Sequence, residues 1–563
     1  MKSLICLGIL LLVAACREKE MLPASSPGTA RSLAQGEVVG FLAKNGAQVW
    51  RGLPFAASTA GENRWRGPRP APEWQGVREA LHFAERCSQL TNQSDEDEGL
   101  EAGLIIGSED CLAVDIYSPA DAQGKALPVM VWIHGGGNVW GRSSAYDGSR
   151  LAENEKVVVV ATQYRLGPLG WFSHPSLRES ATTPEDAAAS FATLDLIAAL
   201  KWVRGNIGVF GGATDNVTVF GESAGGHNVA ALLASPLAEG LFHRAIIQSG
   251  SFDSTSLAAA QGFEGTLANT SMEVAKRLGV SKAEELRAVP LAELFAAYEQ
   301  GSGFLDVPRV IEDGVVLPAR PLREAFASTE TFHTVPIMVG TNRDEMKLFY
   351  AGNPELIKKA LGFLPVPHDQ EFYDALTGYI SRLWRIRAVD QPAAMMARAG
   401  HHAVYAYRFD WDDGGRLLSM DFKTLFGAAH GFEIPFVFNR FQYLGDADRF
   451  LFQDRTASER ENLSRAMGGY WASFARDGLP SSPAGPPWPT YSEKGASFLR
   501  FDTDSDGGIE VAQGADTLEA LVVDLKGDPR LDKVQRCRII REMGEWMFTR
   551  PIYETVRAAV ECR

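Results

Sequence analysis

Residues 217–226 constrain the fold more than any other part of the chain. The run Val-Thr-Val-Phe at 217–220 is apolar and rich in β-branched side chains, which predicts a buried strand. A run compatible with a helix follows at 228–233, and Gly-Glu-Ser-Ala-Gly lies between the two. Small residues there permit a very tight strand-to-helix turn that lifts the hydroxyl of Ser223 out of the sheet. The pattern predicts a nucleophile elbow, with the N–H groups of the helix start beside the serine.

Further apolar runs alternate with helical stretches along the chain. Residues 127–133 and 156–161 predict buried strands, and residues 193–203 have the spacing of a helix that leads into the elbow strand. Shorter strands are expected at 245–248, 335–339 and 403–407. Residues 37–55 alternate weakly around glycines and predict an N-terminal hairpin. Together these elements indicate an α/β fold with a mainly parallel sheet.

Length and charge narrow the class of protein. A chain of 563 residues has room for several domains, but large α/β enzymes of this length form a single one. We therefore expect one domain over residues 37–563. The net charge of −15 argues against nucleic acid as a partner, because nucleic-acid binding requires a basic face.

Residues 1–15 have the pattern of a secretory signal peptide. Lys2 supplies a positive start, and an apolar run of about eleven residues follows at 5–15. This run is shorter than the roughly 20 residues needed to span a bilayer. Residues 16–36 are polar and contain proline, serine and glycine, so we expect them to form a tether.

Cys16 ends the sequence Val-Ala-Ala-Cys, which resembles the lipobox of bacterial lipoproteins. The resemblance implies that Cys16 is lipidated and attaches the protein to a membrane. Arg17 stands where an aspartate typically retains such lipoproteins in the inner membrane, so the expected location is the outer membrane, periplasm or cell surface. The alternative is ordinary cleavage after Ala15, which leaves a free thiol.

Four further cysteines agree with export. They allow three connectivities, of which the local pairing Cys87–Cys111 and Cys537–Cys562 is favoured because each bridge closes a modest loop. Disulfides persist in oxidising compartments. The alternative is four buried thiols.

A second glycine-rich segment follows the predicted strand 127–133. His134 is succeeded by three glycines, which free the backbone to turn its N–H groups inward. This is the arrangement of the second half of an oxyanion hole in hydrolases with a nucleophile elbow. A flexible glycine turn is the structural alternative.

From about residue 37 to the C-terminus, the chain resembles the type-B carboxylesterase family, the carboxylesterase and cholinesterase group of α/β-hydrolases. The resemblance implies the α/β-hydrolase fold and a serine esterase without cofactor or metal, acting on small-molecule esters. It rests on seven motifs in family order: Glu-Asp-Cys-Leu (109–112), Trp-Ile-His-Gly-Gly-Gly (132–137), Tyr-Arg-Leu-Gly-Pro-Leu-Gly (164–170), Gly-Glu-Ser-Ala-Gly-Gly (221–226), Ala-Ile-Ile-Gln-Ser-Gly (245–250), Gly-Thr-Asn-Arg-Asp-Glu (340–345) and His-Gly-Phe-Glu-Ile-Pro (430–435).

The resemblance also implies a catalytic triad. Ser223 is the nucleophile, His430 its general base and acid, and Glu345 the carboxylate that orients the imidazole. His227 and Asp344 are the neighbouring candidates that this assignment sets aside. His430 must be neutral to accept a proton, so activity is expected to rise with pH through its pKa, near 6–7 for an unperturbed imidazole.

Around the triad, the N–H groups of Gly136, Gly137 and Ala224 are expected to form the oxyanion hole. Glu222 and Ser249 are expected to support the triad as polar neighbours, although a purely structural role is equally open for both. Residues 502–513 copy the first half of a calcium loop, but Gln513 replaces the bidentate glutamate, so a polar hairpin turn is expected.

Departures from the family pattern bear on the substrate. Asn138 replaces the apolar or aromatic residue that usually follows the three glycines, and Met346 replaces the glycine that usually follows the acid. The loop between Cys87 and Cys111 lacks the tryptophan that would hold a quaternary ammonium group, so acetylcholine is not expected as substrate. Aromatic candidates for an apolar acyl or alcohol pocket are Trp140, Trp171, Phe349 and Phe436.

The sequence leaves two other classes of function open. One is a catalytically silent binding or adhesion module on the same fold, whose usual mark is loss of the serine or histidine. The other is the same machinery acting on amides, thioesters or carbonates. The physiological substrate and the oligomeric state are left open by the sequence.

Overall fold

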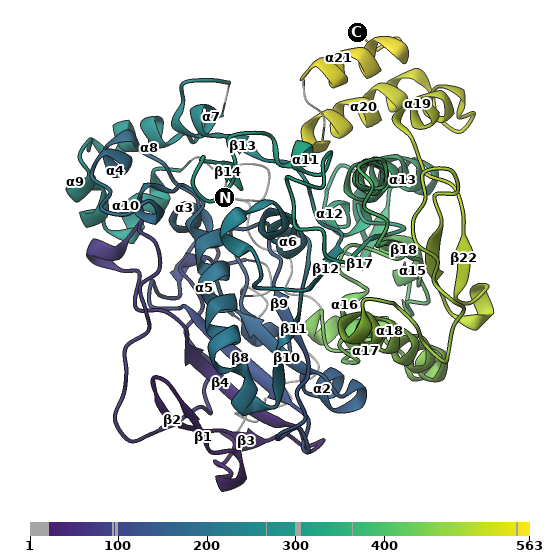
Figure 1. Ribbon diagram of the computed structural model, residues 1–563. Helices are drawn as coiled ribbons and strands as arrows, with labels where there is room; N and C mark the ends of the chain where they lie inside the picture. The colour runs from purple at the N-terminus through teal and green to yellow at the C-terminus, as the bar shows by residue number, and fades with distance from the viewer. Residues whose placement is uncertain are drawn as a thin grey trace.

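The fold is organised around one large mixed β-sheet. The structure is a computed structural model and describes residues 22–92, 95, 99–265, 267–298, 306–362, 364–547 and 550–562. The predicted signal peptide and Cys16 therefore lie outside the described residues. The central sheet has 11 strands in the order β22-β21-β18-β15-β12-β11-β9-β10-β8-β4-β3. In Figure 1 the strands β3, β4 and β8 lie at the lower left and β22 lies at the right.

The middle of this sheet is parallel, as the sequence predicts. Its neighbours pair in parallel from β10 through β21, with Val131 of β9 opposite both Val160 of β10 and Val219 of β11. These strands are β9 (Leu127–Ile133), β10 (Val158–Thr162), β11 (Gly212–Glu222), β12 (Arg244–Gln248), β15 (Ile337–Asn342), β18 (Val404–Phe409) and β21 (Phe498–Phe501). Each predicted strand is present, and β11 begins five residues before the predicted run because the sheet extends it past the apolar stretch.

The two ends of the sheet are antiparallel. Strands β3 (Phe41–Leu42), β4 (Gln48–Pro54) and β8 (Ala113–Ser118) continue one end, and β3 and β4 form the predicted hairpin. At the other end β21 pairs antiparallel with β22 (Glu510–Ala512). Residues 502–509 connect these two strands, so the calcium-like segment is a hairpin turn as expected.

Both faces of the parallel strands are buried, which explains their continuous apolar sequence. Along β9, Val129, Val131 and Ile133 belong to one hydrophobic cluster, whereas Met130 and Trp132 belong to the cluster on the opposite face. Helices cover both faces in Figure 1. The main ones are α5 (Phe191–Asn206), α6 (Ala224–Ala234), α13 (Gln370–Arg385), the π-helix η7 (Ile386–Asp390), α14 (Gln391–Arg398), α18 (Ala457–Asp477), α19 (Leu518–Gly527), α20 (Lys533–Met547) and α21 (Arg550–Ala559).

The packed region begins earlier than the sequence boundary at residue 37. Strand β1 (Arg31–Leu33) pairs with β2 (Gly36–Val39), and the indole N–H of Trp50 donates a hydrogen bond to the carbonyl of Thr29 at 2.9 Å. The hydroxyl of Thr29 is also bonded by the N–H of Gly40. The expectation of a tether over 16–36 is therefore wrong for its second half, because its polar groups find partners on β2, on Gly40 and on Trp50 of β4.

Both predicted disulfides are present: Cys87–Cys111 and Cys537–Cys562. The second ties α20 to the end of the chain beyond α21, in the yellow region of Figure 1. Among the described residues, no helix combines the length and the apolar character that crossing a membrane requires.

Candidate active site

Ser223 lies at the turn between β11 and α6. Its backbone has φ 57° and ψ −122°, a conformation that non-glycine residues rarely adopt. The flanking glycines allow it, since a Cβ on Gly225 would lie 2.0 Å from the carbonyl oxygen of Ile133 and one on Gly221 2.7 Å from the same atom. The turn between the strand and the helix is as tight as the sequence predicts, and only glycine fits two residues before and two residues after Ser223.

The glycine segment after β9 lies against this elbow. A Cβ on Gly135 would lie 3.1 Å from the Cβ of Ser223. Gly136 has φ 99° and Gly137 φ 61°, both in the left-handed region. Within the described chain, the N–H groups of Gly136, Gly137 and Ala224 take part in no hydrogen bond. Three backbone donors are thus available near the serine.

His430 and Glu345, 85 residues apart in the chain, meet in a buried hydrogen bond. Nδ1 of His430 lies 2.5 Å from Oε2 of Glu345. The other carboxylate oxygen of Glu345 accepts the N–H of Asn342 at 2.7 Å and the hydroxyl of Ser249 at 2.6 Å. Ser249, for which a supporting and a purely structural role were both open, therefore contacts the carboxylate directly. Every oxygen of Glu345 is engaged, which fixes the carboxylate toward the imidazole.

The second imidazole nitrogen faces the elbow. Nε2 of His430 lies 3.1 Å from Oε1 of Glu222, the residue before Ser223, but the two atoms are not aligned for a hydrogen bond. Within the described part of the chain this buried nitrogen has no hydrogen-bond partner. Buried polar atoms are normally bonded, so an unpartnered imidazole nitrogen beside the residue that precedes Ser223 is a functional signal.

Electrostatics keep a proton in this cluster. Burial alone would lower the pKa of His430, but the carboxylates of Glu222 and Glu345 raise it to about 9. Burial raises the pKa of Glu222 to about 8. The sequence-based value near 6–7 applied to an unperturbed imidazole, and the two carboxylates displace it upward.

A third buried glutamate, Glu433, lies in the same family motif as His430, and the sequence alone suggests no role for it. Its carboxylate accepts hydrogen bonds from the side-chain amides of Asn342, at 2.6 Å, and Gln248, at 3.0 Å. Burial raises the pKa of Glu433. Its position three residues after His430 was the only available signal, because the two amide partners come from other strands.

The neighbouring candidates for the triad are engaged elsewhere. Asp344 accepts hydrogen bonds from Arg343 and from the N–H of Ala428. Nε2 of His227 lies 2.6 Å from the carbonyl oxygen of Asp253, and burial lowers the pKa of His227 to about 4. The structure therefore gives the hydrogen bond with a carboxylate to His430 alone among these histidines.

Aromatic side chains surround the imidazole. The rings of Phe349 and Trp384 lie with centroids 5.1 and 4.9 Å from that of His430, and they stack on each other. Phe349 was a candidate for the pocket from the sequence. Trp384 was missed because it lies on α13, outside the family motifs that contain Glu345 and His430. The candidates Trp171 and Phe436 are fully buried within the hydrophobic core.

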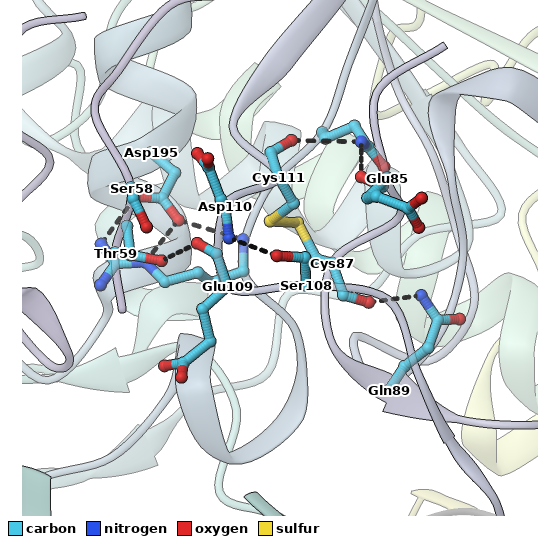
Figure 2. The surroundings of a disulfide bond; sticks show 12 residues. Ser58, Thr59, Glu85, Cys87, Gln89, Ser108, Glu109, Asp110, Cys111 and Asp195 are labelled. Carbon is cyan, nitrogen blue, oxygen red and sulfur yellow. Dashed lines mark hydrogen bonds and ion pairs between the residues drawn. A yellow bond between two sulfur atoms is a disulfide. The ribbon is translucent and has the colours of Figure 1, made fainter. Parts of the chain in front are cut away.

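The disulfide Cys87–Cys111 supports the segment after the glycine loop. Figure 2 shows the bridge with Gln89 beside it. The amide of Gln89 donates to the carbonyls of Cys87 and Gly141, and its oxygen accepts the N–H of Gly141 at 2.9 Å. The bridge thus fixes the chain four residues beyond Gly137.

Only one group of side chains in the described residues has the spacing of metal ligands: the carboxylates of Asp412, Asp413 and Asp506. Cations already compensate it, since Nζ of Lys423 lies 2.7 Å from Asp412 and Arg343 bonds the same carboxylate. It includes one residue of the calcium-like segment, and it lies outside the cluster around His430.

The central parallel sheet, the nucleophile elbow and the histidine–carboxylate pair define an α/β-hydrolase. The sequence model of the carboxylesterase family matches residues 28–363 and 366–519. The chain belongs to this family and is a carboxylic ester hydrolase, for which small-molecule esters are the implied substrates.

Named relatives span nearly the whole chain. Human cocaine esterase is 34% identical over 87% of this chain and 90% of its own length. Para-nitrobenzyl esterase of Bacillus subtilis is 34% identical over 82% and 92%. Among solved structures, a thermophilic PNB esterase matches with a TM-score of 0.68 at 30% identity, covering 87% of this chain and 99% of that one. The carboxylesterase of Geobacillus stearothermophilus matches with a TM-score of 0.67 at 31% identity, over 86% and 97%.

Proposed function

We propose that the chain is an exported serine esterase that hydrolyses carboxylic esters through an acyl-enzyme, with Ser223, His430 and Glu345 as its catalytic triad. The observation that carries the proposal is the imidazole of His430, bonded by Glu345 on one nitrogen and unpartnered on the other. This is the arrangement that a general base needs beside a serine hydroxyl.

The reaction follows from these positions. Nε2 of His430 takes the proton from Ser223 as the serine oxygen attacks the ester carbonyl. The N–H groups of Gly136, Gly137 and Ala224 stabilise the oxyanion, and each such donor is worth roughly 10²–10³ in rate.

The tetrahedral intermediate then expels the alcohol, which receives its proton from the imidazolium of His430. Water attacks the acyl-enzyme by the same route, with His430 taking a proton from water and returning one to the oxygen of Ser223. Throughout, Glu345 holds Nδ1–H and stabilises the imidazolium.

The surroundings favour esters with an apolar group next to the reacting carbonyl. Phe349 and Trp384 pack against the imidazole, and Trp140 lies partly exposed beside Gly136. Amides, thioesters and carbonates can use the same machinery. A silent binding module is disfavoured because Ser223 and His430 are both retained.

Export is supported by the two disulfides, which persist in oxidising compartments. The proposal includes cleavage of residues 1–15 and lipidation of Cys16, with residues 16 to about 25 as a tether to the packed domain and one hydrolase domain after it. The expected location is the periplasm, outer membrane or cell surface.

The test is hydrolysis of p-nitrophenyl esters of increasing chain length by the purified protein and by Ser223→Ala. The substitution should lower kcat by about 10⁶-fold. A fluorophosphonate should label the wild type at Ser223 only. Ser251→Ala is the matched control, since that hydroxyl bonds Asp253 near the elbow and takes no part in the proposed reaction. Full turnover by Ser223→Ala would refute the proposal.

A further inference from the structure

Asn138 follows the three glycines, at a position where the family usually has an apolar or aromatic residue. It is fully buried, with φ 63°. Asparagine tolerates this left-handed conformation better than most residues. Its carbonyl accepts the N–H of Gly167 at 2.7 Å. The backbone of Asn138 is therefore fixed at the end of the segment that carries Gly136 and Gly137.

The side chain of Asn138 reaches the helix after the nucleophile. Nδ2 of Asn228 donates a hydrogen bond to Oδ1 of Asn138 at 2.9 Å, and both residues have no exposed surface. Asn228 lies in the second turn of α6, whose first residue is Ala224. One amide–amide bond thus joins the two segments that supply the oxyanion donors.

Tyr164 fixes the other end of the glycine segment. Its hydroxyl donates to the carbonyl of His134 at 2.7 Å and lies 3.4 Å from Oδ1 of Asn138. Since a hydroxyl has one hydrogen, the shorter contact takes it. The ring of Tyr164 also stacks on that of His134, with centroids 4.5 Å apart. The segment is therefore held at both of its ends.

The amide pair has a cost that an apolar pair would avoid. Nδ2 of Asn138 and Oδ1 of Asn228 are buried and have no hydrogen-bond partner in the described part of the chain. Turning both amides over exchanges the roles but leaves one donor and one acceptor unpaired. Burying unpaired polar atoms is unfavourable. A pair maintained at this cost is better explained by the position it fixes than by stability.

We propose that Asn138 and Asn228 are positioning residues that set the distance between the two parts of the oxyanion hole. Neither amide reaches the substrate, because both act through the backbone N–H groups of Gly136, Gly137 and Ala224. The inference rests on the proposed function, since the hole matters only if Ser223 forms a tetrahedral intermediate. Oxyanion donors act over a narrow range of distances, and a displacement of about 1 Å can cost roughly 10²-fold in rate.

The experiment is a double-mutant cycle with Asn138→Gly and Asn228→Ala. Glycine keeps the left-handed backbone available and removes only the side chain. Kinetics with p-nitrophenyl acetate give kcat and KM, and a trifluoromethyl ketone, whose adduct with serine places an oxyanion in the hole, gives Ki. Asn206→Ala is the matched control, a buried asparagine on α5 that bonds the carbonyl of Trp202.

Each single substitution is expected to lower kcat by about 10- to 100-fold, with KM within about twofold and Ki raised in parallel with the loss in kcat. The double variant should be no worse than the more impaired single one, because both remove the same bond. Asn206→Ala should change the melting temperature without changing kcat or Ki.

Two results would overturn the inference: unchanged kcat and Ki with only a lower melting temperature, or single losses that multiply in the double variant. If Asn228→Ala yields no folded protein, Asn138→Gly decides alone through its Ki. Activity of Ser223→Ala separates the two proposals. If that variant is inactive while Asn138→Gly behaves as wild type, the inference fails and the proposed function stands.

Discussion

The charge of Glu222 should set the pH at which the esterase becomes active. Nε2 of His430, the base of the proposed triad, lies 3.1 Å from Oε1 of Glu222. A negative carboxylate there stabilises the imidazolium, so the base becomes neutral only at higher pH. The raised pKa of His430, about 9, places the rising limb of kcat/KM well above neutrality in the wild type.

The magnitude follows from Coulomb's law. Two unit charges at this separation interact by about 5 kcal/mol at an effective dielectric constant of about 20, and 1.36 kcal/mol corresponds to one pKa unit. The full effect is not available, because the pKa of Glu222 is itself about 8 and its charge develops over the same pH range. We therefore expect Glu222→Gln to move the rising limb to lower pH by about one to two units.

The assay is kcat/KM for p-nitrophenyl acetate from about pH 5 to 10, read at the isosbestic wavelength of p-nitrophenol. Glu239→Gln is the matched control, since it removes one exposed carboxylate shortly after α6 and should leave the profile unchanged. A profile of Glu222→Gln that coincides with the wild type, or moves to higher pH, would refute this electrostatic assignment. So would a wild-type profile that is flat across the range.

Three further outcomes are expected. Glu345→Gln should lower kcat by about 10⁴-fold, because the imidazole loses the carboxylate that fixes its tautomer. The control Asp344→Asn should lower kcat far less. Equal losses of the two variants in steady-state kinetics would count against Glu345. Replacing Cys537 and Cys562 together by serine should lower the free energy of unfolding by about 3.5 kcal/mol, as the closed loop of 25 residues implies, and an unchanged denaturant midpoint would contradict this. Cys16→Ser should move the protein from the membrane to the soluble fraction of the cell, and an unchanged distribution would exclude lipid attachment.

Sequence patterns predicted the parts of the fold that local physics determines. The strand at 127–133 was placed with its observed bounds, because a continuous apolar run followed by glycines has few alternatives. The tight turn at Ser223 was equally predictable from the sequence, because its glycines are required: a Cβ at either of them would lie closer to neighbouring backbone atoms than van der Waals distance. The antiparallel strand β8 was missed because its sequence, Ala-Val-Asp-Ile-Tyr-Ser, buries an aspartate that interrupts the apolar pattern.

Site residues were predictable from the sequence where their partners lie close by in the chain. Ser223 and the glycines occupy short motifs, whereas His430 and Glu345 were assigned through the family resemblance rather than from spacing. The roles of Glu433, Trp384 and Asn228 depend on distant partners. The two partners of Glu433 lie 185 and 91 residues away, that of Trp384 about 46 and that of Asn228 90. Contacts of this kind leave no periodicity in the sequence, and only folding brings them together.

The strained backbone of Ser223 lowers the stability of the fold by an amount that a glycine at this position would recover. A residue with a Cβ held at φ 57° and ψ −122° costs about 1–3 kcal/mol relative to a relaxed conformation. Glycine would release most of that strain, so Ser223→Gly should unfold at a higher temperature than the wild type while hydrolysing nothing. Selection for thermal stability alone would therefore favour an inactive protein, and only selection for turnover keeps a side chain at this strained position.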